Sequence, residues 1–552
     1  MLQEQKSCGG QWYHCVPWRR LREAGGVATL MMLFWVVFTW FDPLGIEGAT
    51  KKQSTILFDR VAAPFYGFGD RPARDGIAVV AITDTTLSNF NATWPLPYAA
   101  HAQTLGRILA GGAKGIFVDI LFNGERAGDS LDAFRYVLDE AKQMDVPVVF
   151  AKAGESQRFQ GPLKDVERAE VTWVSERYYP LHVEGSGSRE HEEVSHAGAH
   201  SASHVEPPAT AAMYLFNRLC VEQKKLDRCP PNVDPSEFEH ELYMRWGSHY
   251  DPVQSSVSDT SKCRTFESSW QSRLMEAADQ AWRSIFAGLT PVFGPAARQS
   301  CFYILTISAE QLGNHDVIDL LKDRIVFYGT DLLTQHDLFN SSVFGQVAGV
   351  QAHAMAFDNL MTYGDNYFRG SPEIHFAGMP ISYAELTELG LWMLMAVTTA
   401  LIHVLRGSHH GDGVRLAGWI AYVSLAVILV LAVVDQLSVR ADIWEAFPFL
   451  LLILAVGVFS SLSVKIFVRS SIEKNPNNIW LSTAFSVSVI SVAFVVNETI
   501  LHWDSANWFG FVLLYLGSRE VAEIMESQGL ASFFFGRRFM RKDEAKNQHL
   551  AD

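Results

Sequence analysis

The chain has 552 residues and a formal net charge of −15, and 48% of its residues are hydrophobic. This length is sufficient for two or three domains. Binding of nucleic acid needs a concentrated basic surface, and no basic stripe occurs between residues 50 and 370, so the composition argues against a nucleic acid partner.

The first apolar segment, residues 25–41, carries no charged side chain and follows the basic residues Arg19, Arg20 and Arg22. This pattern predicts a transmembrane helix that acts as a signal anchor, with residues 1–24 in the cytoplasm. A cleaved signal peptide is the alternative, although no small-x-small cleavage site follows the segment.

Apolar stretches return in the last third of the chain, where residues 386–517 predict a bundle of four or five transmembrane helices. The stretch 500–517 contains Trp503 and Asp504 and is expected to be either a fifth span or an interfacial segment. The tail 518–552 combines phenylalanines with arginines, which is typical of an amphipathic helix that lies on the inner leaflet or contacts a partner. The clear spans are 386–405, 416–434, 446–468 and 479–496.

The distribution of basic residues indicates the orientation of the chain in the membrane. With both termini in the cytoplasm, Arg440 is the basic residue expected between spans on the outer side, and the domain of about residues 50–370 lies outside the cytoplasm. The basic residues expected inside are Arg406, Arg415, Lys465, Arg469, Lys474, Arg519, Arg537, Arg538, Arg541, Lys542 and Lys546.

Cysteine usage agrees with export of this domain. Cys220, Cys229, Cys263 and Cys301 lie within it, and an even set in an oxidising compartment predicts two disulfides. We expect Cys220 to pair with Cys229 and Cys263 with Cys301. Buried free thiols are the alternative.

Strand-like and helix-like segments alternate from residue 76 onward. Nearly continuous apolar strands separated by helices predict an α/β layer sandwich with a mostly parallel sheet, next to the multi-helix α transmembrane region. An irregular insertion is expected at about 185–300, with a surface loop at 185–210 and helices at 210–224 and 270–286. The expected strands are 77–82, 115–120, 146–150 and 324–329, and the expected helices are 99–110 and 130–143.

Histidines repeat at short spacing in the predicted loop, at His191, His196, His200 and His204. Neutral imidazoles at such spacing are able to bind zinc, copper or nickel. The flexible composition gives them no fixed geometry and His182 lies outside the repeat, so a solvated loop is preferred to a metal site.

Three aspartates, Asp84, Asp119 and Asp337, lie at or just after the ends of predicted strands. Ligands bind at that edge of open parallel sheets, so an acidic ligand site is one hypothesis. Capping of helices and turns is the other. No phosphate-binding glycine loop and no nucleophile elbow occurs in a suitable context, so we expect no catalytic residue and no cofactor.

Four groups of stretches occur in a characteristic order, namely 82–84 with 94–98, 109–122, 323–329 with His336 and Asp337, and 349–354 with 357–360. In this order they resemble the CHASE2 family, the extracellular sensory domain of bacterial membrane-bound kinases and cyclases. The likeness covers about residues 50–370. Beyond the spans no kinase or cyclase domain matches, which leaves the output unexplained.

The resemblance implies a multi-pass protein of the bacterial cytoplasmic membrane whose exported domain senses an unknown small-molecule or envelope ligand. We expect no enzymatic activity, and a signal carried through the helices to a separate cytoplasmic or membrane protein partner. The oligomeric state stays open, a homo-oligomer included. The candidate ligand-binding residues are positions that match the family's motifs, namely Asp84, Trp94, Asp119, Asp337 and His353. Gly349 also matches these motifs and is not a ligand-binding candidate.

The alternative function is a structural or assembly subunit of an envelope complex that does not switch. A transporter is the third hypothesis. It is disfavoured because Asp435, Glu498 and Asp504 fall at the predicted outer ends of spans and His403 near an inner end, whereas an ion path needs ionisable residues at mid-bilayer.

Overall fold

The computed structural model describes most of residues 45–371, in the ranges 45–67, 72–154, 161–171, 178–183, 208–263, 269–286 and 301–371 without Asn123, Asn232, Gln335 and His336, and also 373–376, 379–382 and the single residues 29, 385 and 502. The predicted spans, the tail 518–552 and the histidine-rich segment thus lie outside the described residues, apart from residues 29 and 502. No helix within the described ranges is both long enough and apolar enough to cross a bilayer.

The chain divides into two compact units, one of residues 1–55 and 371–552 and the other of residues 56–370. The second unit contains the sheet. The first contains, among its described parts, the hairpin of β11 (Glu373–Phe376) and β12 (Met379–Ser382). Helix α2 (Ile46–Ala62) begins in the first unit and ends in the second.

The second unit is built on a six-stranded sheet in the order β4-β3-β2-β8-β1-β7, with every neighbouring pair parallel. The predicted α/β sandwich with a parallel sheet is confirmed. The strands are β1 (Ile77–Thr83), β2 (Gly115–Asp119), β3 (Val148–Lys152), β4 (Glu167–Glu170), β7 (Leu305–Ser308) and β8 (Ile325–Asp331).

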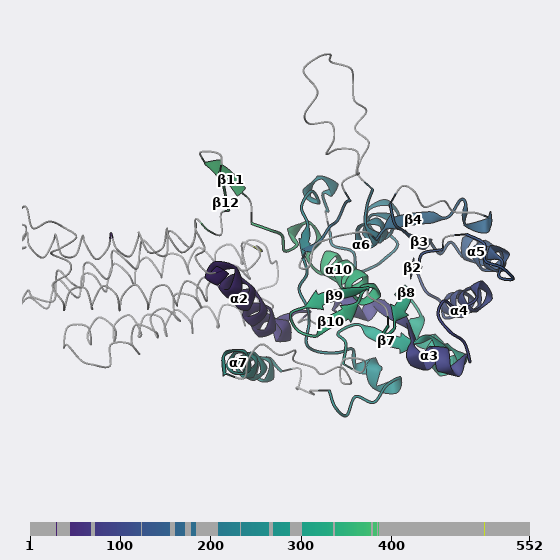
Figure 1. Cartoon of the computed structure of the whole chain (residues 1–552), viewed down its shortest axis with the longest axis horizontal. Coiled ribbons are helices and arrows are strands. Elements are labelled where there is room, and N and C mark those ends of the chain that lie inside the picture. The colour runs from purple at the N-terminus through teal and green to yellow at the C-terminus, as the bar shows by residue number, and fades with distance from the viewer. Residues whose placement is uncertain are drawn as a thin grey trace, which may run out of the picture. The chain divides into compact units, whose positions relative to one another are not determined.

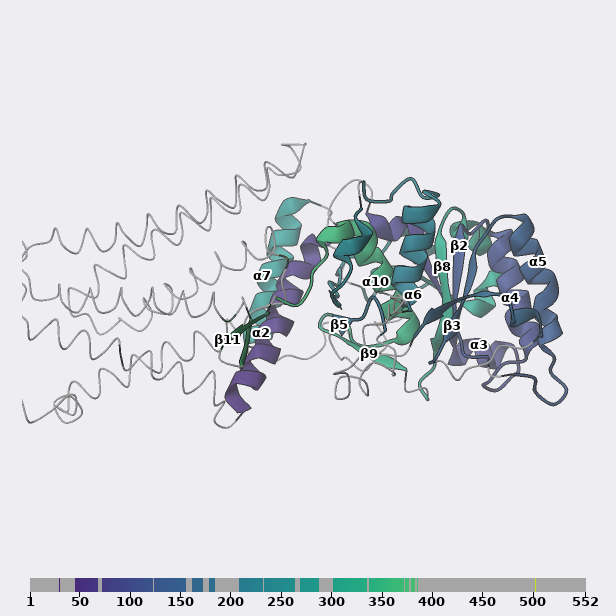
Figure 2. The same cartoon turned by 90° about the horizontal axis from the view of Figure 1, so that it is seen from above.

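Two layers of helices cover the sheet, as Figures 1 and 2 show. On one face, β-strand side chains such as Val118 and Tyr328 pack with α4 (Tyr98–Ala110) and α5 (Arg135–Gln143). On the other face, Phe117 and Phe327 pack with α6 (Ala211–Phe216) and α10 (Gly349–Tyr363). Because both faces are covered, the central strands are buried on both sides, which explains their continuous apolar sequences.

The smaller elements lie around this sandwich. Helix α5 is preceded by a 3₁₀ turn at Leu131–Phe134, and α6 continues as a π-helical turn at Asn217–Glu222. The other elements are α3 (Asp84–Asn89), α7 (Trp270–Phe286), α9 (His315–Ile318), the pair β5 (Tyr178–Tyr179) and β6 (Leu242–Tyr243), the hairpin β9 (Leu338–Ser341) and β10 (Gly345–Ala348), and 3₁₀ turns that include Ala63–Phe65, Ala73–Gly76 and Pro252–Ser256.

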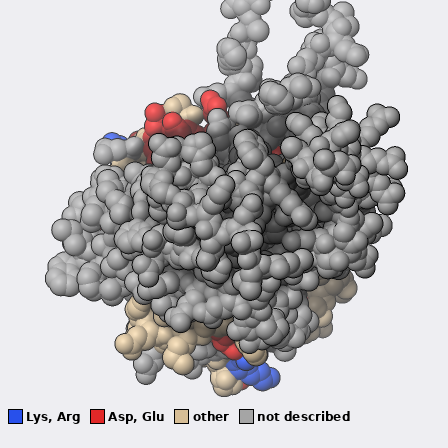
Figure 3. All heavy atoms as spheres, turned by 90° about the vertical axis from the view of Figure 1, so that its left-hand side faces the viewer, with Lys and Arg blue, Asp and Glu red and all other residues tan. Residues whose placement is uncertain are grey.

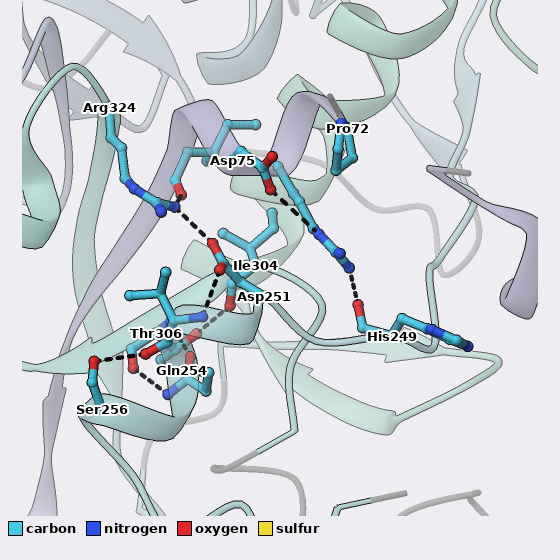
Figure 4. A network of polar contacts seen from close by, with 12 residues as sticks. Pro72, Asp75, His249, Asp251, Gln254, Ser256, Ile304, Thr306 and Arg324 are labelled. Carbon is cyan, nitrogen blue, oxygen red and sulfur yellow. Dashed lines mark hydrogen bonds and ion pairs between the residues drawn. The ribbon is translucent and has the colours of Figure 1, made fainter. Parts of the chain in front are cut away.

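The free edge of β7 is satisfied by a side chain. The carboxamide of Gln254 donates to the Thr306 carbonyl at 2.8 Å and accepts from the Thr306 amide at 2.7 Å, as a further strand would do. Nearby, Arg324 donates to the carbonyl of Ile77 and to the carboxylate of Asp251, both at 2.9 Å (Figure 4). These bonds fix the segment around residues 251–256 to the sheet.

Both predicted disulfides are present with the expected pairing. Cys220 is bonded to Cys229, and Cys263 to Cys301, with Cα–Cα separations of 5.4 and 5.5 Å. The second disulfide closes a segment of 38 residues that contains α7. Figure 3 shows acidic side chains gathered at the upper edge of this face, and acidic and basic groups side by side at its lower edge.

Candidate functional site

The carboxyl ends of three neighbouring strands bring the predicted acidic residues to one edge of the sheet. Strand β8 pairs with β1 on one side and with β2 on the other, so the ends of all three are adjacent. Asp119 is the last residue of β2, and Asp84 is the first residue after β1. Asp337 follows the turn after β8 and directly precedes β9.

Two glycines allow helix α10 to begin against this edge. A Cβ atom on Gly329, in β8, would lie 2.8 Å from Cβ of Val350 and 3.0 Å from Cβ of Asp119. A Cβ atom on Gly349, the first residue of α10, would lie 2.6 Å from Oδ1 of Asp337. The absence of these atoms therefore brings the amino end of α10 into contact with both carboxylates.

His353 lies one turn into α10 and joins the site from the helix. Its Nδ1 is 2.7 Å from the hydroxyl of Tyr179, and that hydroxyl accepts a hydrogen bond from the amide of Ala212. The hydroxyl of Tyr179 is able to donate its hydrogen to Nδ1, and the imidazole proton then lies on Nε2, the nitrogen 3.6 Å from Oδ1 of Asp119. Burial lowers the pKa of His353 to about 3, so the ring is neutral.

The two carboxyl groups at the site differ in their environments. The side chain of Asp119 is only 7% exposed, and burial, reinforced by the negative charge of Asp337, raises its pKa well above the usual value. Asp337 is exposed and its backbone carbonyl accepts from the amide of Gly349 at 3.0 Å. Burial also raises the pKa of Asp337. Asp119 is the more deeply buried of the two, so we assign the negative charge of the pair to Asp337 and the more tightly held proton to Asp119.

Asp84 lies at the same edge and has a structural contact. Its carboxylate accepts from the amide of Leu333 at 3.3 Å, and it is the first residue of α3, where a negative charge is favoured by the helix dipole. The helix-capping interpretation thus describes Asp84 well. Exposed leucines lie after the same strand ends, namely Leu121, Leu333 and Leu338.

Trp94 is not brought together with the other candidates. It packs against the ring of His101, with centroids 6.1 Å apart, on the face of the sheet that α4 covers. His353 and Phe117 lie on the opposite face, with ring centroids 5.2 Å apart. The structure therefore groups Asp119, Asp337 and His353, places Asp84 beside them, and separates Trp94.

No group of three or more histidine, cysteine or acidic side chains suited to a metal ion occurs among the residues that the structure describes. The histidines 191, 196, 200 and 204 lie outside those residues. His182, which is described, pairs through its backbone with Ala209.

A scan of the chain against protein families matches the CHASE2 domain over residues 30–398, which is more than half of the chain. The chain belongs to the CHASE2 family. Comparison with curated proteins found no match, and comparison with solved structures found none either. The CHASE2 match includes every residue of the site and the whole parallel sheet.

Within this CHASE2 domain, sequence reasoning missed Tyr179, whose hydroxyl is hydrogen-bonded to the ring of His353. Tyr179 belongs to the two-residue strand β5, far from Asp119 and His353 in the sequence. A strand of two residues is too short to show a period in its hydrophobic pattern, so no local sequence pattern indicates that Tyr179 belongs to the site.

Proposed function

We propose that the chain is a membrane-anchored sensor that detects a ligand outside the cytoplasm and signals through its transmembrane helices to a separate cytoplasmic partner. The observation that carries the proposal is membership of a family of sensory domains over residues 30–398. The predicted spans on either side of the domain supply the anchor. The domain itself is not an enzyme in this proposal.

The ligand is proposed to bind at Asp119, Asp337 and His353. The exposed carboxylate of Asp337 accepts hydrogen bonds from a donor such as an amine or hydroxyl, while Asp119 and His353 lie deeper and are both able to donate. Leu121, Leu333 and Leu338 add an exposed apolar rim. A small molecule with a donor group and an apolar part suits this surface.

Signalling requires two arrangements of the domain that the ligand distinguishes. A tenfold shift between them needs a difference of about 1.4 kcal/mol in binding free energy. Helix α10 connects the site to the interior because Gly349 and His353 lie at its amino end and the rest of the helix is packed in the core.

The test is photo-cross-linking in living cells from a position beside Arg537 in the predicted cytoplasmic tail. We expect capture of a cytoplasmic protein whose yield changes when Asp337 is replaced by Asn and stays constant in the matched control Asp139→Asn, an exposed aspartate of α5. Capture that neither variant alters would contradict signalling from this site. A stoichiometric envelope partner in every growth condition would favour the assembly subunit instead.

A further inference from the structure

A second titratable cluster lies in the interior of the domain, further along α10 than the candidate site. Asp358 is completely buried, and one of its oxygens, Oδ2, accepts a hydrogen bond of 2.6 Å from the hydroxyl of Tyr66. The other oxygen, Oδ1, is buried without a hydrogen-bond partner. A carboxylate with half of its acceptor capacity unsatisfied is a costly group to bury, whereas a protonated carboxyl is much less so.

Aromatic side chains enclose this carboxyl group. Tyr303 packs edge-on against Tyr66, with ring centroids 5.2 Å apart, and Tyr363 does the same at 6.0 Å. The hydroxyl of Tyr303 is also buried without a partner. Gly67 and Gly247 lie against Tyr303 so closely that a Cβ atom on either would overlap its side chain. The cluster is therefore tightly packed, and two of its buried polar atoms, Oδ1 of Asp358 and the hydroxyl oxygen of Tyr303, have no hydrogen-bond partner.

The charged groups around the cluster have partners of their own, although Nε of Arg74 is buried without a hydrogen bond. The guanidinium of Arg74 lies 4.7 Å from the centre of the Tyr303 ring, donates to the carbonyl of His249, and is 3.7 Å from the carboxylate of Asp75. Figure 4 labels Asp75 and His249, the two residues that Arg74 contacts in this network. Farther out, Arg273 of α7 donates to the carbonyl of Pro64, and Glu276 is 2.7 Å from the ring of His249.

The electrostatics agree with the geometry. Burial raises the pKa of Asp358 to about 7, against the opposing effects of the Tyr66 hydrogen bond and the charge of Arg74, and Asp75 raises it further. Between about pH 4 and 7 the unfolded chain has released this proton while the folded chain keeps it. The unfolding free energy contributed by Asp358 thus falls as pH rises through that window.

We propose that Asp358 and the tyrosines around it form a proton-sensitive contact, which holds the chain that follows α2 against α10 when the carboxyl is protonated and loosens when it ionises. The carboxyl hydrogen neutralises the group, so the side chain is buried without a charge and keeps the hydrogen bond from Tyr66. Loss of that hydrogen leaves a buried charge with one hydrogen bond, which favours entry of water and separation of Tyr66 from α10.

This contact joins the segment after α2 to α10, so loosening of the contact is able to affect both helices. Tyr66 follows the 3₁₀ turn at the end of α2, the helix that continues from the predicted first span. Asp358 shares α10 with His353 of the candidate site. The proposal does not depend on ligand binding at Asp119 and stands even if that site has another role.

The experiment uses the full chain in detergent micelles with its disulfides intact, from pH 5 to 9. Infrared absorption of protonated carboxyl groups measures the proton, and hydrogen exchange in peptides from residues 56–67, corrected for the pH dependence of intrinsic exchange, measures the contact. We expect a common midpoint near pH 7 and exchange that is ~10-fold faster above it. Asp358→Asn should remove the exchange transition and reduce the infrared transition by the contribution of one carboxyl group, whereas the control Asp139→Asn should leave both unchanged.

Substitutions of the neighbours give shifts of opposite sign, which a merely structural role would not produce. Tyr66→Phe and Arg74→Gln each remove an interaction that lowers the pKa of Asp358, so the midpoint should rise. Asp75→Asn removes a negative charge, so the midpoint should fall. These shifts keep the proposal testable if Asp358→Asn fails to fold. An exchange transition that stays at the same pH in all three variants would overturn it.

Discussion

The side chains that are missing at Gly329 and Gly349 shape the candidate site as much as those that are present. Both positions have ordinary negative backbone φ angles, so the requirement for glycine comes from contact and not from conformation. A methyl group at Gly349 would displace the carboxylate of Asp337 from the start of α10. It would remove the arrangement that couples Asp337 to Asp119.

Gly349→Ala should destabilise the domain by about 1–3 kcal/mol, because the added Cβ overlaps Asp337. The matched control is Gly106→Ala in α4, where a Cβ meets nothing within 4 Å and the change should stabilise the helix by about 0.5–1 kcal/mol. Denaturant unfolding of the full chain, followed by tryptophan fluorescence, measures both. Equal effects of the two substitutions would contradict the close contact at Gly349.

At the level of residues, the sequence predicted part of the site. Asp119 and Asp337 were found because each follows an apolar strand, and the carboxyl ends of parallel strands share an edge. Trp94 also matches a motif of the CHASE2 family, yet it lies on the opposite face of the sheet from His353. The order of motifs along the chain does not indicate which face of the sheet a side chain occupies. Asp358 and Tyr66 were missed because their contact joins residues 292 positions apart.

Among the elements, the exposed edge of β7 shows how a loop replaces a strand. Gln254→Ala removes both hydrogen bonds to the backbone of Thr306, so we expect a loss of about 1–3 kcal/mol in unfolding free energy. Gln254→Glu should cost at least as much, because a carboxylate is unable to donate to the Thr306 carbonyl. The exposed Gln103 of α4 is the control, and its replacement by Ala should change the unfolding free energy by less than about 0.5 kcal/mol.

The two disulfides should contribute unequally to stability. In the chain-entropy model, a loop of 38 residues gives roughly 4 kcal/mol and one of 9 residues roughly 3 kcal/mol. Replacement of Cys263 and Cys301 by Ser should therefore lower the thermal midpoint more than replacement of Cys220 and Cys229. Thermal unfolding of the two double variants, each also measured in reductant, compares them. The reverse order would show that enthalpic contacts, and not loop closure, determine the difference.

Within the six-stranded sheet, the strands that the sequence predicts are buried on both faces, and the strands that it misses are the two edge strands, β4 and β7. β1, β2, β3 and β8 carry continuous apolar runs. By contrast, β4 is charged at three of its four positions and β7 alternates buried with half-buried residues. The start of β3 was placed two residues early, at Val146, because Pro147 interrupts an otherwise apolar run and supplies no amide for the ladder.

For the whole molecule, the position of β8 is the decisive feature of the topology. The sequence predicts that this strand completes the sheet, and the structure places it in the centre, between β1 and β2. Its pairs with β1 and β2 therefore join residues that are more than 200 positions apart in the chain. Residues 208–263 lie within the segment predicted as an irregular insertion. They contribute Phe216, Leu242 and Trp246 to the hydrophobic core on the face of the sheet that α10 covers.

The orientation of the molecule in the membrane is the prediction on which the sensor proposal depends. Trypsin added to intact spheroplasts should cleave the large domain, and Arg189, in the segment predicted as a surface loop, is the expected site. Both disulfides lie after that residue, so the two fragments should separate on a denaturing gel without reductant. The tail contains Arg537, Arg538 and Arg541, which are equally good trypsin sites in an unpacked chain, and it should remain uncut until the cells are lysed. The tail is thus an internal control for membrane integrity in the same polypeptide. Cleavage of the tail before the domain would show that the chain has the opposite orientation. A ligand outside the cytoplasm could then not be the signal.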